Sequence, residues 1–481
     1  MSFAFVPAYI GFLGIEAYGL IGFFTSMMAA FAVLDLGLGI TVNRELSCAA
    51  GKGEGAGQAR DLFRTLELIY WVIALVIGLS IALLAPLIVD HWLNIRSLDR
   101  DTVVNGVRAM GVTALMRWPV SLYFGALLGM QQQVRLNIVT SAAATLAGAG
   151  AVGVLGFVAD DIAAFFLWQA AIASLQVLVL RWLAWRAAPM PEHRPKIGFG
   201  VLRASIGFSS GVTGIMLLSV ILTQLDKFAL SWLLPLDIFG YYALAAAIAA
   251  MLLAAGAAVE SAAFPALSRL VATGDVDGER QLYHQASRWL AILIIPLTIT
   301  VVLFAPELLI AYLRDPAIAA ATAPFLSLLA AGNGILALMF MPLALQLAHG
   351  WTRLSLIKNI IAVCVFVPLL FLFVQRLGAL GAGWTWISLT LGYVLIEVPV
   401  MHRRLLPGAQ WAWYLKDNGI PLIISLGVLG LLRMLLSPDI GVLPQLALIG
   451  GATFMAQAGS VALLASARKM VLRHGARLRP L

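Results

Sequence analysis

Long hydrophobic stretches run along almost the whole chain, and polar residues gather in the short gaps between them. A helix that crosses a bilayer needs about 20 mostly apolar residues. The pattern predicts an all-α polytopic membrane protein with thirteen full spans, at roughly residues 18–42, 66–88, 103–129, 136–158, 162–185, 205–233, 239–266, 287–306, 321–345, 354–375, 383–401, 419–437 and 444–466. A shorter stretch, Ser2 to Leu13, precedes them and is too short to cross at about 1.5 Å per residue. We expect an upstream start to complete it, giving about fourteen helices.

Composition supports a membrane protein. The chain is 62% hydrophobic and 11% charged, whereas soluble domains are about 25% charged. The net charge of +8 therefore indicates basic cytoplasmic loops rather than nucleic-acid binding. The two cysteines, Cys48 and Cys364, have no pairing or metal-ligand spacing. We find no GxxxxGK[ST] nucleotide loop and expect no cofactor and no metal.

The basic residues are unevenly distributed between alternate loops. Twenty-three of the 31 fall in one set of segments, and four lie in the opposite loops. Cytoplasmic loops carry the excess of Lys and Arg in membrane proteins. We therefore predict that both termini are cytoplasmic, as are the basic segments 43–65, 130–135, 181–203, 267–288, 353–358, 402–416 and 468–479.

An internal repeat appears at an offset of 221 residues. The segment EAYGLIGFF from Glu16 recurs as DIFGYYALA from Asp237, which pairs Gly19 with Gly240. The matching helices are six apart, so the two halves have the same orientation. Parallel six-helix repeats predict two lobes around a central cavity. We expect an N-lobe, a basic cytoplasmic linker, a C-lobe, two appended helices and a basic cytoplasmic tail at 1–185, 186–204, 205–401, 402–467 and 468–481.

Several segments carry a resemblance to a known family. They are GIEAYGLIGFFTSMMAAFAVLDLGLGITVNRELS, TQLDKFALS, FGYYALA and FPALSRL. They resemble the polysaccharide transporters of the multidrug/oligosaccharidyl-lipid/polysaccharide exporter superfamily, which include the Wzx-type O-antigen flippases. The resemblance implies a protein that is not an enzyme and that sits in the bacterial cytoplasmic membrane.

The same resemblance implies a substrate and partners. The substrate would be an O-antigen or exopolysaccharide repeat unit on an undecaprenyl pyrophosphate carrier, moved by alternating access between two lobes. H⁺ or Na⁺ could drive the cycle, in contact with membrane lipids. A polysaccharide polymerase and a chain-length regulator would be the protein partners.

Three other functions compete with this interpretation. A drug/cation antiporter of the same superfamily would need acidic residues to bind a cation, whereas Arg117 and Lys227 are basic. A lipid II flippase of the superfamily also has fourteen helices. A membrane glycosyltransferase or polymerase would need a large outer loop, and the outer loops here are too short to form one.

Two adjacent charges interrupt one apolar segment. Asp226 and Lys227 lie about 100° apart on a helix, so we expect them on different faces. Lys227 falls on a polar stripe that we expect to line the cavity, and Asp226 should point to a neighbouring helix. Lys227 would contact substrate phosphate or sugar, or form a structural ion pair. The stripe comprises Ser209, Thr213, Gln224, Lys227 and Ser231.

An arginine in the middle of the predicted span 103–129, the fourth of the fourteen helices, is the second strong candidate. Arg117 is too deep to snorkel easily, and Thr113 and Ser121 should share its face. Its guanidinium fork suits a diphosphate, and the alternative is an ion pair with Asp35 or Asp226. Arg44 marks the cytoplasmic mouth, either attracting anionic headgroups or anchoring the helix.

The remaining candidates are two carboxylates and an amide. Asp35 and Glu260 lie within spans and could carry a coupling proton, as could Asp226, or each could pair with a basic residue. Asn333 falls in the middle of a span, where its side chain could form a hydrogen bond in the cavity or a hydrogen bond between two helices.

Overall fold

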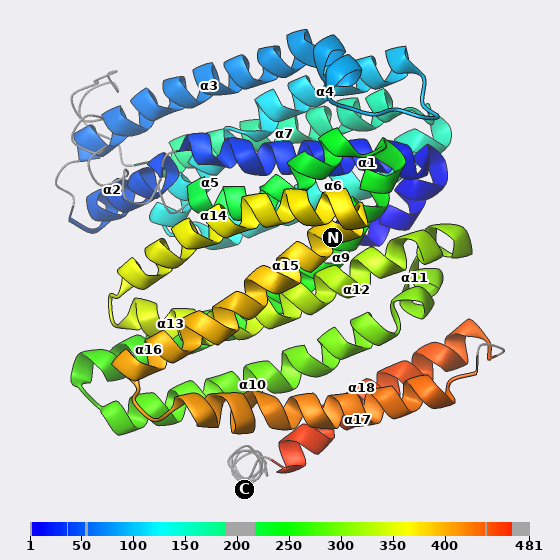
Figure 1. The fold of residues 1–481 in the computed structure, drawn as a ribbon. Coiled ribbons are helices and arrows are strands. Elements are labelled where there is room, and N and C mark those ends of the chain that lie inside the picture. The colour runs from blue at the N-terminus through cyan, green and yellow to red at the C-terminus, as the bar shows by residue number, and fades with distance from the viewer. Residues whose placement is uncertain (1, 36, 53–55, 189–216, 438–439, 464–481) are drawn as a thin grey trace, which may run out of the picture. The chain divides into compact units, whose positions relative to one another are not determined.

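The computed structural model describes residues 2–35, 37–52, 56–188, 217–437 and 440–463, and these residues are helical, with no strand among them (Figure 1). They form two compact units, Met1–Gly240 and Tyr241–Leu481. Eleven helices in this part of the chain are long and apolar enough to cross a membrane. The prediction of an all-α polytopic membrane protein is confirmed.

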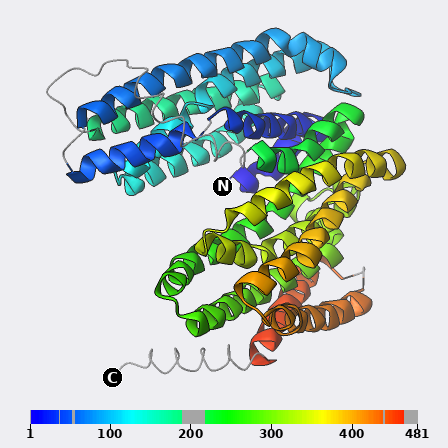
Figure 2. The same cartoon turned by 60° about the vertical axis from the view of Figure 1, so that its left-hand side comes forward.

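The first unit contains the N-terminal helices. In it, α3, α4 and α7 lie side by side (Figure 2). Its elements are η1 (Ser2–Phe5), α1 (Val6–Phe31), η2 (Ala32–Asp35), α2 (Leu38–Lys52), α3 (Ala56–His91), α4 (Arg100–Arg117), α5 (Val120–Gly129), α6 (Gln133–Phe157), α7 (Ile162–Ala187), a helix at residues 217–233, and the start of α9 (Leu236–Thr273).

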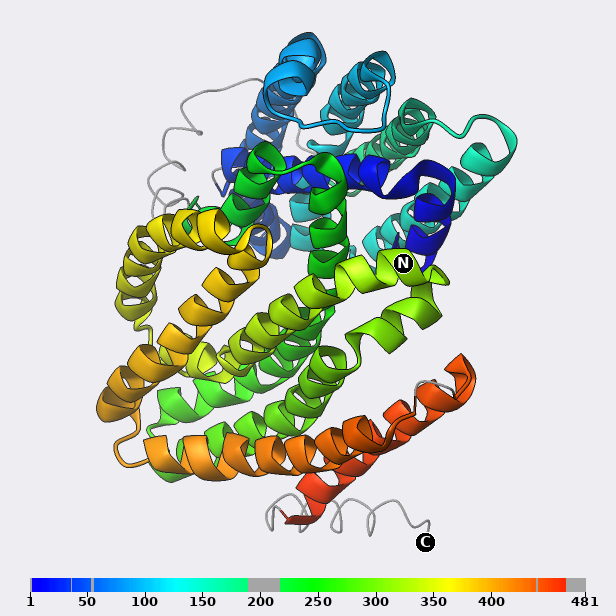
Figure 3. The same cartoon turned by 45° about the vertical axis from the view of Figure 1, so that its right-hand side comes forward.

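The second unit contains the rest of α9 and the C-terminal helices. In it, α17 and α18 pack as a pair (Figure 3). The elements are α10 (Val276–Leu303), α11 (Ala305–Leu313), α12 (Pro316–Leu338), α13 (Phe340–Ala348), α14 (Thr352–Leu377), α15 (Leu380–Gly392), the π-helix η3 (Tyr393–Glu397), α16 (Val398–Leu405), the π-helix η4 (Ala412–Gly419), α17 (Ile420–Leu435) and α18 (Val442–Leu463).

The first predicted full span, 18–42, is not one continuous helix. α1 ends, the short 3-10 turn η2 follows, and α2 then begins. Gly37 has a backbone φ of +72°, a conformation that residues with a side chain rarely adopt. The carboxylate of Asp35 accepts a hydrogen bond from the backbone N–H of Gly39 at 3.1 Å, as an N-cap does. The helix therefore stops and restarts inside the span.

The third predicted full span, 103–129, is broken as well. α4 ends at Arg117 and α5 begins at Val120. Pro119 lies between them and has no backbone N–H with which to continue the helical hydrogen bonds. Arg117 therefore lies at the end of a helix, not in the middle of one as the sequence pattern suggested.

The two breaks touch each other. The indole N–H of Trp118, in the second break, donates to the carbonyl of Phe31 at the end of α1, at 3.2 Å. A Cβ atom on Gly125 would lie 2.5 Å from the carbonyl oxygen of Gly39. Only glycine allows α5 to approach α2 so closely. The contact holds the two discontinuous helices together.

The internal repeat appears in the structure as a reciprocal contact between α1 and the first turn of α9, both within the first unit. A Cβ on Gly19 would lie 2.6 Å from the carbonyl oxygen of Leu236, and a Cβ on Gly240 would lie 2.3 Å from that of Ile15. Leu236 and Gly240 are the repeat partners of Ile15 and Gly19. A contact in which each copy offers the same surface is typical of two-fold related elements.

A loop after α3 contacts the acidic residue of each repeat copy. The buried carboxylate of Glu16 accepts hydrogen bonds from the backbone N–H groups of Arg96 at 2.6 Å and Ser97 at 2.9 Å. The guanidinium of Arg96 reaches Asp237 at 3.4 Å. The same loop therefore contacts both copies of the repeat, at Glu16 on α1 and at Asp237 on α9.

The boundary between the units differs from the predicted lobe boundary. The units divide after Gly240, so residues 217–240 group with the first unit, although the predicted C-lobe is 205–401. Contacts to the loop after α3 explain this, because Trp92 donates to the hydroxyl of Ser231 at 3.0 Å. Residues 189–216, which hold most of the predicted linker (186–204) and the start of the predicted C-lobe, lie outside the described residues.

The glycine contact leads to a stability prediction. Gly240→Ala should lower the midpoint of thermal unfolding in detergent, because the new methyl group overlaps the backbone of Ile15 and overpacking costs about 1–3 kcal/mol. Gly427→Ala in α17 is the matched control. It meets nothing within 4 Å, so it should leave the midpoint unchanged or raise it. Equal midpoints for the two variants would contradict the proposed contact.

Candidate functional site

Asp35 lies at the break between α1 and α2 and is half-buried. Its carboxylate accepts a hydrogen bond from the phenol of the buried Tyr70 on α3, besides the bond from Gly39. No ion pair of Asp35 occurs within the described residues. Of the partners of Asp35 in the described residues, one is a phenol and one is a helix N-terminus; the basic residue that was one of its two predicted alternatives is not among them.

Arg117 is exposed at the end of α4, beside the second break. In the part of the chain that the structure describes, its guanidinium forms neither a hydrogen bond nor an ion pair. The surroundings differ from the prediction, because Thr113 is fully buried and donates to the carbonyl of Phe166 on α7 at 2.9 Å. Ser121 is exposed in the first turn of α5. Neither Asp35 nor Asp226 neutralises Arg117.

Lys227 and Asp226 form an ion pair with each other, with the ammonium 3.3 Å from the carboxylate. The ammonium also donates to the carbonyl of Thr223 at 2.6 Å. The two side chains leave the helix about 100° apart, and the flexible lysine stem bends back along its own helix to reach the carboxylate. Both side chains are mostly buried, at 23% and 13% exposed.

The rest of the predicted stripe is only partly retained. Gln224 is half-buried one turn before Lys227. Ser231 is fully buried and accepts a hydrogen bond from Trp92, so it faces the loop after α3 rather than a cavity. Ser209 and Thr213 lie outside the described residues. The polar surface of this helix is therefore shorter than we predicted.

Three further candidates lie apart from these residues in the sequence. Arg44 is exposed on α2. In the second unit, Glu260 is half-buried on α9 and makes no hydrogen bond or ion pair with the described residues. Asn333 is buried on α12 and accepts a hydrogen bond from the indole of Trp386 on α15 at 2.8 Å. Of its two predicted roles, Asn333 has the structural one.

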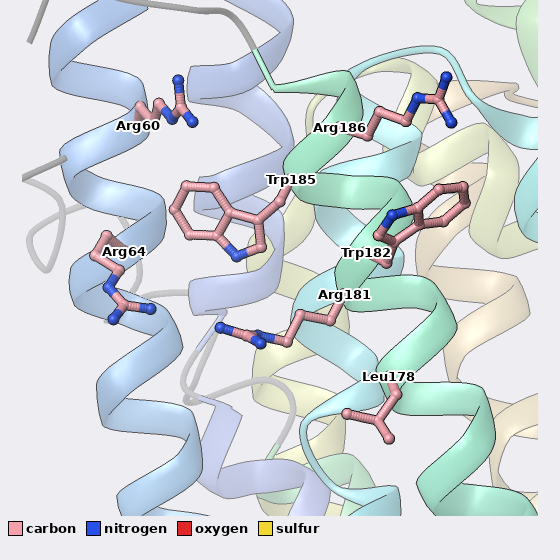
Figure 4. Close-up of a pocket in the computed structure, with 7 residues that line it drawn as sticks. All are labelled: Arg60, Arg64, Leu178, Arg181, Trp182, Trp185 and Arg186. Carbon is pink, nitrogen blue, oxygen red and sulfur yellow. The ribbon is translucent and has the colours of Figure 1, made fainter. Parts of the chain in front are cut away.

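The structure also contains a basic pocket that we did not predict. It opens between α3 and α7 and has a volume of about 690 Å³. Figure 4 shows Arg60 and Arg64 extending from α3 toward α7, and Arg181 and Trp185 extending back toward α3. The basic pocket is lined by Arg60, Arg64, Leu178, Arg181, Trp182, Trp185 and Arg186.

A single buried carboxylate organises the basic pocket. Glu67, on α3, is 2% exposed. It accepts hydrogen bonds from Arg64 at 2.6 Å, Arg181 at 2.8 Å, Trp185 at 3.0 Å and Tyr123 at 2.8 Å. We counted these arginines only as loop charges. The signal was their spacing, because Arg60 and Arg64, and likewise Arg181 and Trp185, are four apart and share a helix face.

The fold and the buried charges define a class of protein. A multi-pass bundle whose helices break inside the membrane, with charged side chains at the breaks, is the architecture of membrane transporters. Residues 12–314 match the family described as "Polysaccharide biosynthesis protein". The chain belongs to this family, and the resemblance seen in the sequence is confirmed.

Solved structures share the fold. An inward closed lipid II flippase MurJ superposes with a TM-score of 0.72 at 12% identity, covering 96% of this chain and 98% of that one. An inward-facing multidrug resistance MATE family transporter of the MOP superfamily superposes with a TM-score of 0.63 at 14% identity, covering 84% and 96%. No curated protein matches the chain in sequence.

The cap at Asp35 gives a second prediction. Asp35→Ala should lower the thermal unfolding midpoint, because α2 loses its N-cap at a cost of about 1 kcal/mol. Asp35→Asn should lower it less, since an asparagine oxygen also accepts from Gly39. Asp99→Ala removes the exposed cap of α4 and serves as the reference for a cap outside the breaks. An Asp35→Ala protein as stable as wild type would show that Asp35 does not hold α2 in place.

Proposed function

We propose that the protein is a flippase that moves a lipid-linked oligosaccharide across the bacterial cytoplasmic membrane, with both termini inside. The substrate would be an O-antigen or exopolysaccharide repeat unit on undecaprenyl pyrophosphate. The family of polysaccharide biosynthesis proteins and the fold shared with a lipid II flippase support this proposal. A polysaccharide polymerase and a chain-length regulator would act on the product.

The observation that carries the proposal is the exposed charge of Arg117. A charged side chain in the middle of a membrane costs about 2.5–3.5 kcal/mol on insertion scales unless it faces protein or water. Arg117 lies at a helix break and is exposed, and neither Asp35 nor Asp226 pairs with it. A guanidinium in this position suits a diphosphate, which it can bind through two parallel hydrogen bonds.

The broken helices support transport by alternating access. Each break supplies a few residues whose backbone can change conformation without disturbing a long helix. The sequence carries no nucleotide loop. The cycle would then draw on an ion gradient or on the gradient of the substrate itself.

A lipid II flippase is the second candidate, because the fold of the whole chain is shared with one. Arg117 is compatible with either anionic lipid. A drug/cation antiporter fits less well, since the exposed mid-span charge of the first unit is basic. Transport assays that offer both lipid substrates distinguish the first two candidates.

Arg117 provides the test of the proposal. Arg117→Ala should reduce transport of lipid-linked oligosaccharide into proteoliposomes more than tenfold, because a charge-assisted bidentate contact is worth about 1.5–3 kcal/mol. Arg117→Lys should restore only part of the rate, since an ammonium cannot make the paired contact. Arg108→Ala is the control: Arg108 is exposed on the same helix, and its one hydrogen bond within the described residues is to Asn105.

The controls determine what each result means. Membrane levels of all three variants should match wild type, which excludes a folding defect. Full transport by Arg117→Ala would remove Arg117 from the substrate path. Equal losses in Arg117→Ala and Arg108→Ala would point to a general effect on α4 instead.

We further propose that a carboxylate couples transport to an ion gradient. Asp226 is our first choice, because it is ion-paired with Lys227 at 3.3 Å. A substrate anion that draws Lys227 away would weaken this ion pair and so favour protonation of Asp226. Asp35 and Glu260 are the other candidates.

The coupling proposal predicts a loss of pH dependence. Asp226→Asn keeps the shape of the side chain and fixes it in a neutral form. Transport should then no longer respond to an imposed pH gradient, while substrate binding persists. Glu260→Gln provides a comparison in the second unit. If wild-type transport itself responds to neither a pH nor a sodium gradient, the coupling proposal fails.

A further inference from the structure

The basic pocket between α3 and α7 has features that ion pairing within the protein does not require. Arg64 and Arg181 both bond Glu67, so one negative charge faces two positive ones. Arg60 and Arg186 add two more, and Asp61 is a further acid on α3. Among the residues that the structure describes in this region, four arginines outnumber two acids.

The arginines are held in position rather than left to rotate freely. Glu67 engages Arg181 through Nε, so it does not occupy the guanidinium fork in a bidentate way. Arg60 lies over the ring of Trp185 with its guanidinium carbon 5.4 Å from the ring centroid. Arg186 lies over Trp182 in the same way, at 5.2 Å. Stacking and bonding lower the entropy that the side chains lose when they bind an anion.

The tryptophans place the basic pocket at the membrane surface. Trp182 is 57% exposed, near the end of a span, and amphipathic rings concentrate at the level of the lipid headgroups. The predicted orientation puts this end of α3 and α7 on the cytoplasmic side. A volume of about 690 Å³ lies within the range of small-ligand sites, which is about 300–1,000 Å³.

We propose that the basic pocket is a binding site for the phosphate groups of a lipid headgroup in the cytoplasmic leaflet, and that this headgroup is the diphosphate of the transported lipid. The identity of the lipid rests on the proposed function. Guanidinium groups bind phosphate oxygens through charge-assisted hydrogen bonds, and several converging forks favour a diphosphate over a single phosphodiester. The apolar tail would remain in the bilayer beside Leu178 and Trp182.

Binding to the full-length protein tests this proposal. The probes are a radiolabelled polyprenyl diphosphate, competed by polyprenyl monophosphate, phosphatidylglycerol and inorganic pyrophosphate. Arg186→Gln is the preferred variant, because Arg186 forms no ion pair with the described residues and its loss leaves no buried charge. Arg181→Gln is avoided, since Glu67 would lose a partner. Arg403→Gln, exposed on α16 at the same predicted membrane side, is the control.

Arg186→Gln should weaken polyprenyl diphosphate binding about tenfold, the loss expected for one charge-assisted contact. Arg403→Gln should bind like wild type. Arg60→Gln is the second variant and should act in the same direction. Unchanged binding in both Arg60→Gln and Arg186→Gln would overturn the proposal.

The competitors distinguish the possible ligands. Weak displacement of the labelled polyprenyl diphosphate by polyprenyl monophosphate and by phosphatidylglycerol supports the diphosphate headgroup. Equal displacement by phosphatidylglycerol overturns the assignment to the transported lipid. Equal displacement by inorganic pyrophosphate overturns the assignment to a lipid.

This experiment is separable from the test of the proposed function. If the protein binds the diphosphate lipid through Arg186 but moves no lipid-linked oligosaccharide, the binding site is supported and the proposed function is contradicted. If the protein moves the lipid-linked oligosaccharide but its lipid binding does not depend on Arg60 or Arg186, the proposed function is supported and the binding site is contradicted.

Discussion

The constraint on which this structure depends is that hydrocarbon offers no partner to a charge or to a free backbone group. The described charges inside the bundle show how the protein meets it. Glu67 is surrounded by four donors, and Asp35 binds a phenol and a helix N-terminus. In the second unit, buried Asp417 contacts His284 and bonds Arg288 at 2.6 Å. Arg117 stands out against this background, because it is exposed at a break.

Glycine contacts decide where the broken helices can meet. The carbonyl oxygens of Gly39 and Ile15 lie where a methyl group on Gly125 or Gly240 would have to be. These contacts are backbone to backbone, so a side chain cannot rotate away to relieve an overlap. The two copies of the internal repeat pack against each other through this kind of contact, because the equivalent glycines Gly19 and Gly240 each lie against the backbone of the other copy. The repeat is thus a contact surface and not only a sequence similarity.

The first unit contains two basic groups, Arg117 and the basic pocket, which lie in different surroundings. Arg117 lies at mid-span beside a helix break, whereas the basic pocket lies near the ends of α3 and α7. Tyr70 and Glu67 are one turn apart on α3. Tyr70 donates a hydrogen bond to Asp35 at the first helix break, and Glu67 accepts one from Arg181 in the basic pocket. α3 is therefore a shared support for both features. Both of the anion-binding sites that we propose therefore depend on the same helix.

The sequence by itself determined the spans, because about 20 apolar residues in a row have no stable alternative in water. It also determined the repeat, the predicted orientation and the candidate charges. It did not determine the breaks at Gly37 and Pro119, because hydropathy averages over single residues. It also did not determine partners: Asp226 pairs with its neighbour, Asn333 bonds Trp386, and Ser231 faces Trp92. Only the tertiary structure decided these, since a partner is set by which helix faces meet in space. The basic pocket arose in the same way, when arginines from helices more than a hundred residues apart converged on Glu67.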